Sequence, residues 1–348
     1  MQRLAADLER LFATHPAVDF TSLTLRSSWR WTGLRTVPFG LRLLHRLPRL
    51  VREEGVEVVL FSSLVTASFA RPMLNRVRQS GALTAAIPHG KDVTLPLAPY
   101  QRFLPGVLRA LDLLLPVSRA TARECTSRGA DPGRVQVVPC GVDVSRFREA
   151  RRWRPNGRGK TVLLSVGRHI RRKGFVWFIE RVLPQLPDGV EYWLAGEGPL
   201  SGEIEGRIRE GKLEERVRLL GRVSDAELAD IYRAADLFVM PNVPVPGDME
   251  GFGIVLLEAG ASGLPAVAAD LEGIRDVVAE GKSGTLVPAG DADGFAAAVL
   301  RYRDNPALLR AARSRAVDHV RATFSWPVVV EQHLAALGER LGAARSAA

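Results

Sequence analysis

The chain of 348 residues is 46% hydrophobic and 25% charged, a composition typical of a globular protein with room for two domains. It contains no run of the roughly 18 apolar residues that a membrane span requires, which argues against an integral helical membrane protein. Its two cysteines, Cys125 and Cys140, match no metal-binding or redox spacing.

The positive charge is unevenly distributed along the chain. The formal net charge is +10; residues 1–150 hold 21 Lys and Arg against 12 Asp and Glu, and residues 151–348 hold 27 against 26. Such an excess favours an anionic partner for the first half, either a phospholipid surface, a nucleic acid or an anionic acceptor, but it is equally typical of a soluble basic surface. Because no helix-turn-helix, zinc-finger or RNA-binding pattern is present, a nucleic acid is the least favoured partner.

The first predicted element is a helix, because "MQRLAADLERLF" has apolar residues at positions 4, 8, 11 and 12. In a doubly wound sheet the first strand is usually central and leads through a glycine-rich turn into the first helix. We therefore expect the first domain to lack that strand in the sequence as given, and we expect native residues upstream of Met1. No secretory signal precedes the helix, which favours a cytoplasmic protein.

Short apolar or β-branched runs then alternate with helical patterns. The predicted strands are 18–25, 56–63, 83–90, 111–118 and 135–143 in the first half, and 161–167, 190–196, 217–221, 236–242, 264–269 and 284–288 in the second. This alternation predicts parallel sheets covered on both faces, so the expected fold class is α/β with two Rossmann-like, doubly wound domains facing a central cleft. We expect domains at 1–150 and 151–324, joined by a polar linker at 148–160.

Three helical segments add detail to this picture. Segment 39–55 has leucines at helical spacing among arginines, which fits either an interfacial helix on anionic lipid or an ordinary helix of the first domain. Ser224, followed three residues later by Glu227, predicts a capping box at a helix start. The amphipathic pattern at 325–343 predicts a terminal helix that packs back on the first domain.

The first candidate site is the loop "GRHIRRKG" (167–174), which follows a predicted strand. Ligands of open parallel sheets bind at the carboxyl ends of the strands. Arg168 offers a planar fork of donors and Lys173 a mobile point charge, a pair suited to a diphosphate. The alternative is a solvated basic loop, because Arg171 and Arg172 lie in the same run.

The second candidate site is "EGFGIVLLEAG" (250–260). Gly251 and Gly253 allow close backbone approach, and the helix predicted from about Ile254 would present free N–H groups to an anion. Glu258 would face the same side as Ile254, where a ribose diol could be bound, and Glu250 would reach toward a transferred group. Stabilisation by the helix dipole explains Glu250 equally well, but it does not explain a second acid within an apolar helix.

The third candidate is His89 in "IPHGKD" (87–92), at the end of a predicted strand of the first domain. A single histidine is more often structural or exposed, and only the expected place of His89 at the cleft edge favours a functional role. No HExxH, paired-His or paired-Asp pattern indicates a metal, and no GxSxG or Cys/His arrangement indicates a covalent nucleophile. We therefore expect neither a metal nor a cofactor.

Together these residues resemble the retaining glycosyltransferases of the GT-B fold, in particular family 4, over about residues 80–340. The segment "EGFGIVLLEA" is similar to the E-x7-E motif of that family, and "GRHIRRKG" is similar to its diphosphate loop. The other matching segments are "VVPCGVDVSRF" (137–147), "LAGEGPL" (194–200), "LLGRVSDAEL" (219–228) and "ASGLPAVAA" (261–269), in the order typical of the family.

The resemblance implies a role for each matched residue. Arg168 and Lys173, next to the turn at Gly167, would hold the donor diphosphate and stabilise it as it leaves. Glu258 would bind the donor ribose, and Glu250 would bind sugar hydroxyls near the reacting carbon. The other implied contacts are the backbone of Phe252, Gly253 and Ile254 to phosphate and sugar, the backbone of Arg222 and Val223 to the nucleobase, His89 at the reaction centre, and Glu197 in a supporting role.

The implied activity is that of a metal-independent, retaining hexosyltransferase acting from a UDP- or GDP-sugar onto a glycan or lipid-linked acceptor. This fits polysaccharide or glycolipid biosynthesis in the cytoplasm or at the cytoplasmic face of an anionic membrane. The spacing of Glu250 and Glu258 disfavours a sugar-nucleotide epimerase of similar fold. The alternatives are a non-catalytic or N-terminally truncated homologue that binds the sugar nucleotide, and a nucleotide-binding regulator.

Overall fold

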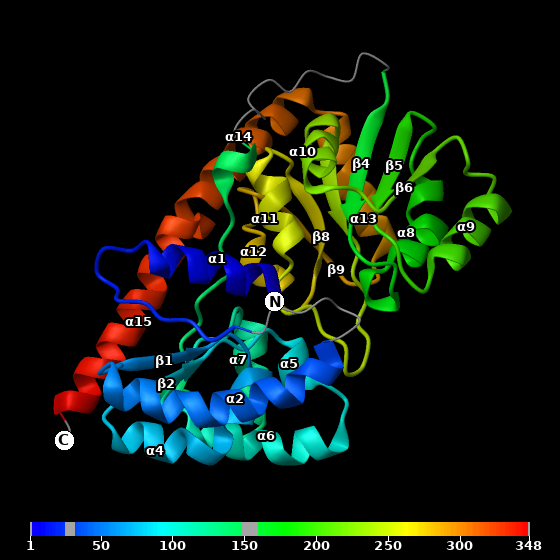
Figure 1. The fold of residues 1–348 in the computed structure, drawn as a ribbon. Helices are drawn as coiled ribbons and strands as arrows, with labels where there is room; N and C mark the ends of the chain where they lie inside the picture. The colour runs from blue at the N-terminus through cyan, green and yellow to red at the C-terminus, as the bar shows by residue number, and fades with distance from the viewer. Residues whose placement is uncertain (1, 25–31, 148–158, 347–348) are drawn as a thin grey trace. The chain divides into compact units, whose positions relative to one another are not determined.

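The structure, a computed structural model, describes residues 2–24, 32–147 and 159–346. Contacts between residues divide the chain into two units, of which the first comprises Met1–Cys140 with Pro327–Ala348 and the second comprises Gly141–Trp326 (Figure 1). The division falls between Cys140 and Gly141 rather than at the predicted residue 150. The predicted linker at 148–160 lies outside the described residues apart from its last two positions.

The first unit contains a parallel sheet of three strands in the order β1–β2–β3. The strands are β1 (Val58–Phe61), β2 (Leu83–Ala86) and β3 (Leu113–Leu114), each shorter than its predicted run. Two predicted strands are wrong. Residues 18–24 form a loop, and 135–143 forms only isolated bridges, such as that between Val135 and Leu114. Both runs have strand-like composition, but a strand exists only where a neighbouring strand pairs with its backbone groups.

Helices surround this sheet in the first unit (Figure 1). They are α1 (Gln2–Ala13), α2 (Thr32–Glu53), α3 (Leu64–Ala70), α4 (Leu74–Gln79), α5 (Lys91–Thr94), α6 (Ala98–Ala110), α7 (Arg119–Ser127) and most of α15 (Trp326–Ser346), with 3-10 turns η2 (Arg71–Met73) and η3 (Pro132–Arg134). The part of α15 from Pro327 onward belongs to this unit, where His333 packs edge-on against Phe12 of α1 with ring centroids 6.3 Å apart.

Helix α2 contains residues 39–53 of the basic segment predicted at 39–55. Its side chains Leu43, Leu47 and Val51 are buried in the core of the first unit, so the interpretation as an ordinary domain helix is confirmed for its apolar face. Leu41 is 64% exposed, and it lies beside the exposed basic residues Arg42, His45, Arg46, Arg49 and Arg52. The helix therefore presents a basic face to solvent while its leucines hold the fold together.

The second unit contains a six-stranded parallel sheet in the order β6–β5–β4–β7–β8–β9. All six strands predicted in this half are present, as β4 (Thr161–Val166), β5 (Val190–Ala195), β6 (Val217–Gly221), β7 (Leu237–Met240), β8 (Ala266–Asp270) and β9 (Gly284–Pro288). The chain winds outward from β4 on one side and from β7 on the other. The order therefore reverses between these two strands, where ligands of doubly wound sheets bind at the carboxyl edge.

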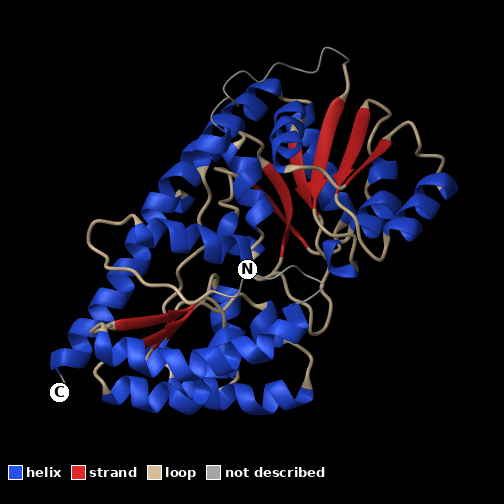
Figure 2. Ribbon diagram, viewed as in Figure 1, coloured by secondary structure: helices blue, strands red, loops and turns tan. Residues whose placement is uncertain are grey.

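Helices cover both faces of this sheet (Figure 2). They are α8 (Phe175–Arg181), α9 (Ser201–Glu210), α10 (Asp225–Ala234), α11 (Ile254–Ala261), α12 (Ile274–Val277), α13 (Ala292–Arg303) and α14 (Pro306–Phe324), with 3-10 turns η5 (Arg171–Lys173) and η6 (Leu183–Gln185). The capping box predicted at the start of α10 is confirmed, because Ser224 Oγ accepts from Glu227 N and the Glu227 carboxylate accepts from Ser224 N. It stabilises the helix immediately after the β6 loop.

The two ends of the second unit are bonded to each other. Val142 N donates to Phe324 O at 2.8 Å, and Trp326 N donates to Val142 O at 3.3 Å. A Cβ atom at Gly141 would lie 2.3 Å from the Trp326 ring, so only glycine fits at the point where the chain enters this unit.

Candidate functional site

The candidate donor-binding residues lie at the carboxyl edge of the second sheet, as the strand assignments predicted. Gly167 follows β4, Gly196 follows β5 and Asn242 lies just beyond β7. A Cβ atom at Gly196, where φ is +128°, would lie 2.0 Å from the carbonyl oxygen of Gly167. The loops after β4 and β5 therefore touch through bare backbone, which leaves space beside them for a ligand.

A cavity of about 740 Å³ opens at this edge of the sheet. Its lining residues are Arg168, His169, Gly196, Glu197, Gly198, Ser201, Glu205, Leu219 and Gly221. Of the predicted donor-binding residues, Arg168 and Glu197 line it, and Arg222 and Val223 follow directly after Gly221. A cation, glycine backbone and an exposed leucine side by side suit a phosphorylated ligand with a flat apolar group.

His169 forms part of the cavity wall and was missed by the sequence analysis. It is buried, and its Nδ1 lies 2.8 Å from Ser201 Oγ, which also accepts from Gly198 N. Burial lowers the pKa of His169, and the charge of Glu197 only partly opposes this. The ring is therefore neutral, and it packs edge-on against Phe175 with centroids 5.8 Å apart.

Lys173 and Glu250 meet beside the cavity loop. Lys173 Nζ donates to Glu250 Oε2 at 2.5 Å, and its alkyl chain passes so close to Gly167 that a Cβ there would lie 3.3 Å from Lys173 Cε. Arg172 and Asn242 donate to the same carboxylate oxygen. Glu250 Oε2 thus accepts three hydrogen bonds, while no hydrogen bond within the described residues reaches Oε1.

The charges around Glu250 decide its ionisation. Burial alone would raise the pKa of this carboxyl group, but the positive charges of Lys173 and Arg172 and the hydrogen bonds from Lys173 and Asn242 outweigh it. They lower the pKa of Glu250 to about 2. Glu250 is therefore a carboxylate throughout the physiological range, with Oε1 as its available acceptor.

Helix α11 begins at Ile254, as predicted, after Gly253 in the left-handed conformation with φ +89°. Phe252 and Gly253 are buried at this entry. Glu258 is 5% exposed, and its Oε2 accepts a hydrogen bond from Tyr232 Oη at 3.1 Å. Burial raises the pKa of Glu258, and the Tyr232 hydroxyl only partly opposes this. Burying a carboxylate costs free energy unless the group is hydrogen-bonded or paired, and the Tyr232 hydroxyl supplies one such bond to Glu258.

His89 lies in the first unit, directly after β2. Its Nε2 is 2.8 Å from the carbonyl oxygen of Ser62, so Nε2 must carry the proton because a carbonyl oxygen only accepts. Burial lowers the pKa of His89, and nearby Asp92 opposes the shift. The ring is therefore neutral, and its Nδ1 is an acceptor.

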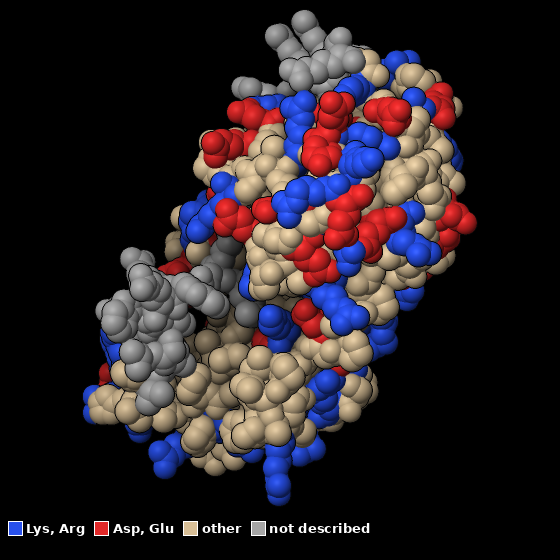
Figure 3. Space-filling view, turned by 90° about the vertical axis from the view of Figure 1, so that its right-hand side faces the viewer, with Lys and Arg blue, Asp and Glu red and all other residues tan. Residues whose placement is uncertain are grey.

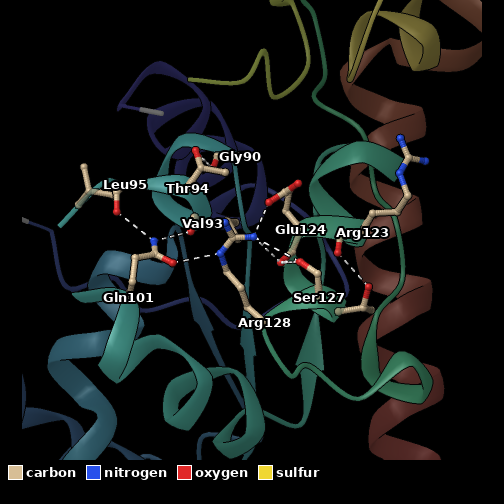
Figure 4. Close-up of polar contacts among 10 residues, drawn as sticks. Gly90, Val93, Thr94, Leu95, Gln101, Arg123, Glu124, Ser127 and Arg128 are labelled. Carbon is tan, nitrogen blue, oxygen red and sulfur yellow. Dashed lines mark hydrogen bonds and ion pairs between the residues drawn. The ribbon is translucent and has the colours of Figure 1, made fainter. Parts of the chain in front are cut away.

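The backbone around His89 is fixed by buried polar contacts. His89 N and Leu64 N both donate to the buried carboxylate of Asp92, at 2.7 and 2.9 Å. Figure 4 shows the hydrogen bonds that hold the following helix, α5. Gln101 Nε2 donates to the carbonyl oxygens of Val93 and Leu95, both at 2.9 Å. Arg128 in turn donates to Gln101 Oε1 at 3.1 Å. The short helix α5, which follows His89, is thus held by Gln101 of α6 and, through Gln101, by Arg128 at the end of α7.

The sequence analysis missed several residues around the predicted ones. Arg172 lies in the run of basic residues that supports the alternative of a solvated loop, although its neighbour Lys173 is a predicted site residue. Asn242 ends a predicted strand at the carboxyl edge, which is a signal that could have found it. Tyr232 and Glu272, whose carboxylate accepts from Glu250 N at 2.5 Å, have no comparable signal in their local sequence.

The surface charge follows the distribution along the sequence. On the face in Figure 3 the first unit shows mainly basic side chains among uncharged ones, whereas the second unit shows both signs closely interspersed. Among the described helices, none combines the length and apolar character needed to cross a bilayer. Within the same described ranges, no group of three or more His, Cys, Asp or Glu is arranged to hold a metal ion.

Two parallel sheets, each covered by helices, define a two-domain protein of the GT-B fold. Comparison with known proteins agrees: residues 9–146 match Glycosyltransferase Family 4, and residues 160–305 match Glycosyl transferases group 1. The chain therefore belongs to the family 4 glycosyltransferases.

Relatives of known name support this membership. The chain is 30% identical over 307 residues to the amylovoran biosynthesis glycosyltransferase AmsK of Erwinia amylovora, covering 85% of this chain and 74% of the relative. It is 34% identical over 240 residues to the phosphatidyl-myo-inositol mannosyltransferase of Mycolicibacterium smegmatis, covering 68% and 58%.

Solved structures share the fold at low identity. HepE of Anabaena in complex with UDP superimposes with a TM-score of 0.73 at 19% identity, covering 88% of this chain and 84% of that one. The lipopolysaccharide outer core galactosyltransferase WaaB superimposes with a TM-score of 0.75 at 15% identity, covering 97% and 95%.

Proposed function

We propose that this glycosyltransferase moves a hexose from a nucleoside-diphosphate sugar to a glycan or lipid-linked acceptor with retention of configuration at the anomeric carbon. The observation that carries this proposal is the cavity of about 740 Å³ lined by Arg168, with Lys173 beside it against Gly167. Two cations and the start of α11 supply the positive charge that a diphosphate leaving group requires.

The proposed reaction proceeds on one face of the donor sugar. The bond from the anomeric carbon to the diphosphate oxygen breaks through an oxocarbenium-like state, and the acceptor oxygen forms its bond on the same face. The acceptor proton passes to the departing phosphate oxygen, so no covalent intermediate is needed. Arg168 and Lys173 stabilise the negative charge as it develops, without a metal ion.

The other site residues have proposed places around the donor. Glu258 binds the ribose hydroxyls, and Glu250 accepts hydrogen bonds from the sugar hydroxyls through Oε1. Neutral His89 acts at the sugar-transfer step through its acceptor Nδ1. The remaining proposed contacts are the backbone of Phe252, Gly253 and Ile254 to phosphate and sugar, the backbone of Arg222 and Val223 to the nucleobase, and the support of Glu197.

The nucleobase of the donor stays open between uracil and guanine. The structural neighbour HepE is solved with UDP and UDP-glucose, whereas relatives from Corynebacterium glutamicum and Mycolicibacterium smegmatis are named as GDP-mannose-dependent enzymes. Names of relatives also favour acceptors of two kinds, an exopolysaccharide and a phosphatidylinositol lipid.

A thermal-shift panel of UDP- and GDP-sugars, followed by a transfer assay with the stabilising donor, tests the proposal. The wild type should be stabilised by one nucleotide series, transfer sugar in the presence of EDTA, and give a product whose anomeric configuration by NMR matches the donor. Lys173→Ala should lose most transfer activity, while Arg171→Ala, on the same loop and exposed, should keep it. Stabilisation by no sugar nucleotide would contradict the proposal, and binding without transfer would favour the non-catalytic alternative.

We further propose peripheral contact of α2 with anionic lipid at the cytoplasmic face of a membrane. The support is its exposed face, where Leu41 lies beside Arg42, Arg46 and Arg49. Co-sedimentation with phosphatidylglycerol vesicles should fall when Arg42, Arg46 and Arg49 are replaced by Gln and should fall with added salt. Equal binding to neutral phosphatidylcholine vesicles would contradict this proposal.

A further inference from the structure

Glu250 is held from two directions at once. Its side chain is bound through Oε2 by Arg172, Lys173 and Asn242. Its backbone is bound by the segment after β8, where Glu272 Oε2 accepts from Glu250 N at 2.5 Å and Gly273 N donates to Glu250 O at 3.1 Å. The direction of the remaining oxygen, Oε1, is therefore set by Arg172 and Lys173 of the loop 167–174 together with Asn242, Glu272 and Gly273, which lie outside the sequence motifs.

Glu272 occupies an unusual backbone conformation. It has φ +46°, and only it and Lys212 have a positive φ without being glycine among the described residues. The next residue, Gly273, packs so closely that a Cβ atom there would lie 2.2 Å from Gly251 O and 2.9 Å from Glu250 O. A strained residue persists where the surrounding structure requires it, and such residues gather at functional sites.

Arg172 contacts the loop that leads to Glu250 at two places. Its side chain is 11% exposed and lies between Glu250 and Asp248, with Nε 3.4 Å from Asp248 Oδ1. Its own carbonyl oxygen accepts from Val243 N at 3.0 Å. Arg172 thus contacts both the beginning and the end of segment 243–250, which Lys173 does not.

Lys173 and Arg172 must also behave differently when a donor binds. The proposed function assigns Lys173 to the diphosphate, and an ammonium group that turns toward phosphate gives up part of its contact with Glu250. Arg172 also forms an ion pair with Asp248, with 3.4 Å between Nε and Oδ1, and its guanidinium group is planar and always charged. It would keep Glu250 ionised and in place after Lys173 has been recruited.

We propose that Arg172 and Glu272 are positioning residues that together fix the direction of Glu250 Oε1, Arg172 through the side chain and Glu272 through the backbone. This inference rests on the proposed function, because its readout is sugar transfer. It concerns the transferred sugar and leaves the nucleotide contacts unchanged, so the effect belongs in kcat rather than in nucleotide affinity.

The substitution Arg172→Gln, with Arg171→Gln as its matched control, tests whether Arg172 positions the side chain of Glu250. Arg172→Gln should lower kcat by roughly tenfold to a hundredfold, with the Kd of UDP or GDP within about twofold of wild type. Arg171→Gln should leave both unchanged, and Arg172→Lys should restore part of kcat. If Arg172→Gln has the kcat of Arg171→Gln, the inference fails while the proposed function stands; a wild type that transfers no sugar overturns both.

The substitution Glu272→Gly tests whether Glu272 positions the backbone of Glu250. Glycine adopts the positive φ without strain, and it lacks the carboxylate that accepts from Glu250 N. We expect Tm to hold or rise while kcat falls by roughly tenfold. Lys212→Gly relieves the same strain on the turn between α9 and β6, and it should raise Tm without changing kcat. Glu272→Gln keeps an acceptor for Glu250 N and should retain most of kcat. Wild-type kcat in Glu272→Gly would show that Glu272 has no positioning role.

Discussion

At the scale of single residues, Glu250 shows how a buried carboxylate stays charged. Its pKa of about 2 lies below the ordinary 4.5 because Lys173 and Arg172 outweigh burial. A folded-state pKa below the unfolded value means that folding releases protons in acid. The associated stability is fully present above pH 4.5 and is lost as the pH falls toward 2.

Glu250→Gln should therefore change both the level and the pH dependence of stability. We expect a loss of roughly 3 kcal/mol at neutral pH, because two buried cations lose their counter-charge. We also expect a shallower decline in stability than in wild type between pH 4.5 and about 2. Urea unfolding across this range measures both, and Glu214→Gln, at an exposed position, should retain the wild-type pH profile. Parallel pH profiles for Glu250→Gln and wild type would contradict the assignment.

The same residue shows what the sequence could and could not predict. Lys173 and Glu250 were each identified from their local patterns, but their pairing spans 77 positions. Nothing local in the sequence states which oxygen is bound or which neighbour binds it. Arg172 looks like surface charge in the sequence, and only the fold shows that it is part of a buried cluster.

At the scale of elements, helix α10 connects two parts of the site. It starts directly after the β6 loop that carries Arg222 and Val223, and near its end Tyr232 binds Glu258. Its start was readable because a capping box is a local signal that pairs residues three positions apart. Strand prediction at 18–25 failed for the opposite reason, since a strand depends on a distant partner that local composition does not reveal.

Ser224→Ala tests the contribution of this cap. It removes the acceptor for Glu227 N, and we expect a loss of about 1 kcal/mol in the free energy of unfolding. Urea denaturation at neutral pH measures it. Ser314→Ala replaces an exposed serine within α14 and should be neutral or slightly stabilising. Equal stabilities of the two variants would mean that the cap contributes little in this context.

At the scale of the whole molecule, the first unit is completed by the last helix of the chain. Val329, Val330, Ala336 and Leu337 of α15 are buried, and Glu331 pairs with His15 at 3.1 Å. Parallel strand–helix alternation predicted two Rossmann-like domains from sequence, but their limits depend on contacts between segments far apart in the chain. Contacts between residues divide the chain between Cys140 and Gly141, and the linker predicted at 148–160 lies outside the described residues apart from its last two positions.

Deletion of residues 327–348 should destabilise the first unit selectively. It exposes the apolar surface of α1 that α15 covers, so we expect a loss of several kcal/mol, in line with about 1.5–3 kcal/mol for each large buried side chain. Two separate unfolding transitions should then appear by calorimetry, with the lower one assigned to the first unit. Deletion of only 342–348, of which residues 342–346 are exposed, should leave the profile unchanged. A single unshifted transition in the longer deletion would contradict this.

The bonded ends of the second unit have a consequence for how such proteins are built. Since Val142 pairs with both Phe324 and Trp326, residues 141–326 form one uninterrupted stretch that leaves the chain of the first unit and returns to it at a single seam. The second unit is therefore a single inserted stretch whose two ends are in contact, because Gly141 packs directly against the Trp326 ring. Exchanging residues 141–326 between relatives at these ends would transfer the whole second unit without cutting any strand of either sheet.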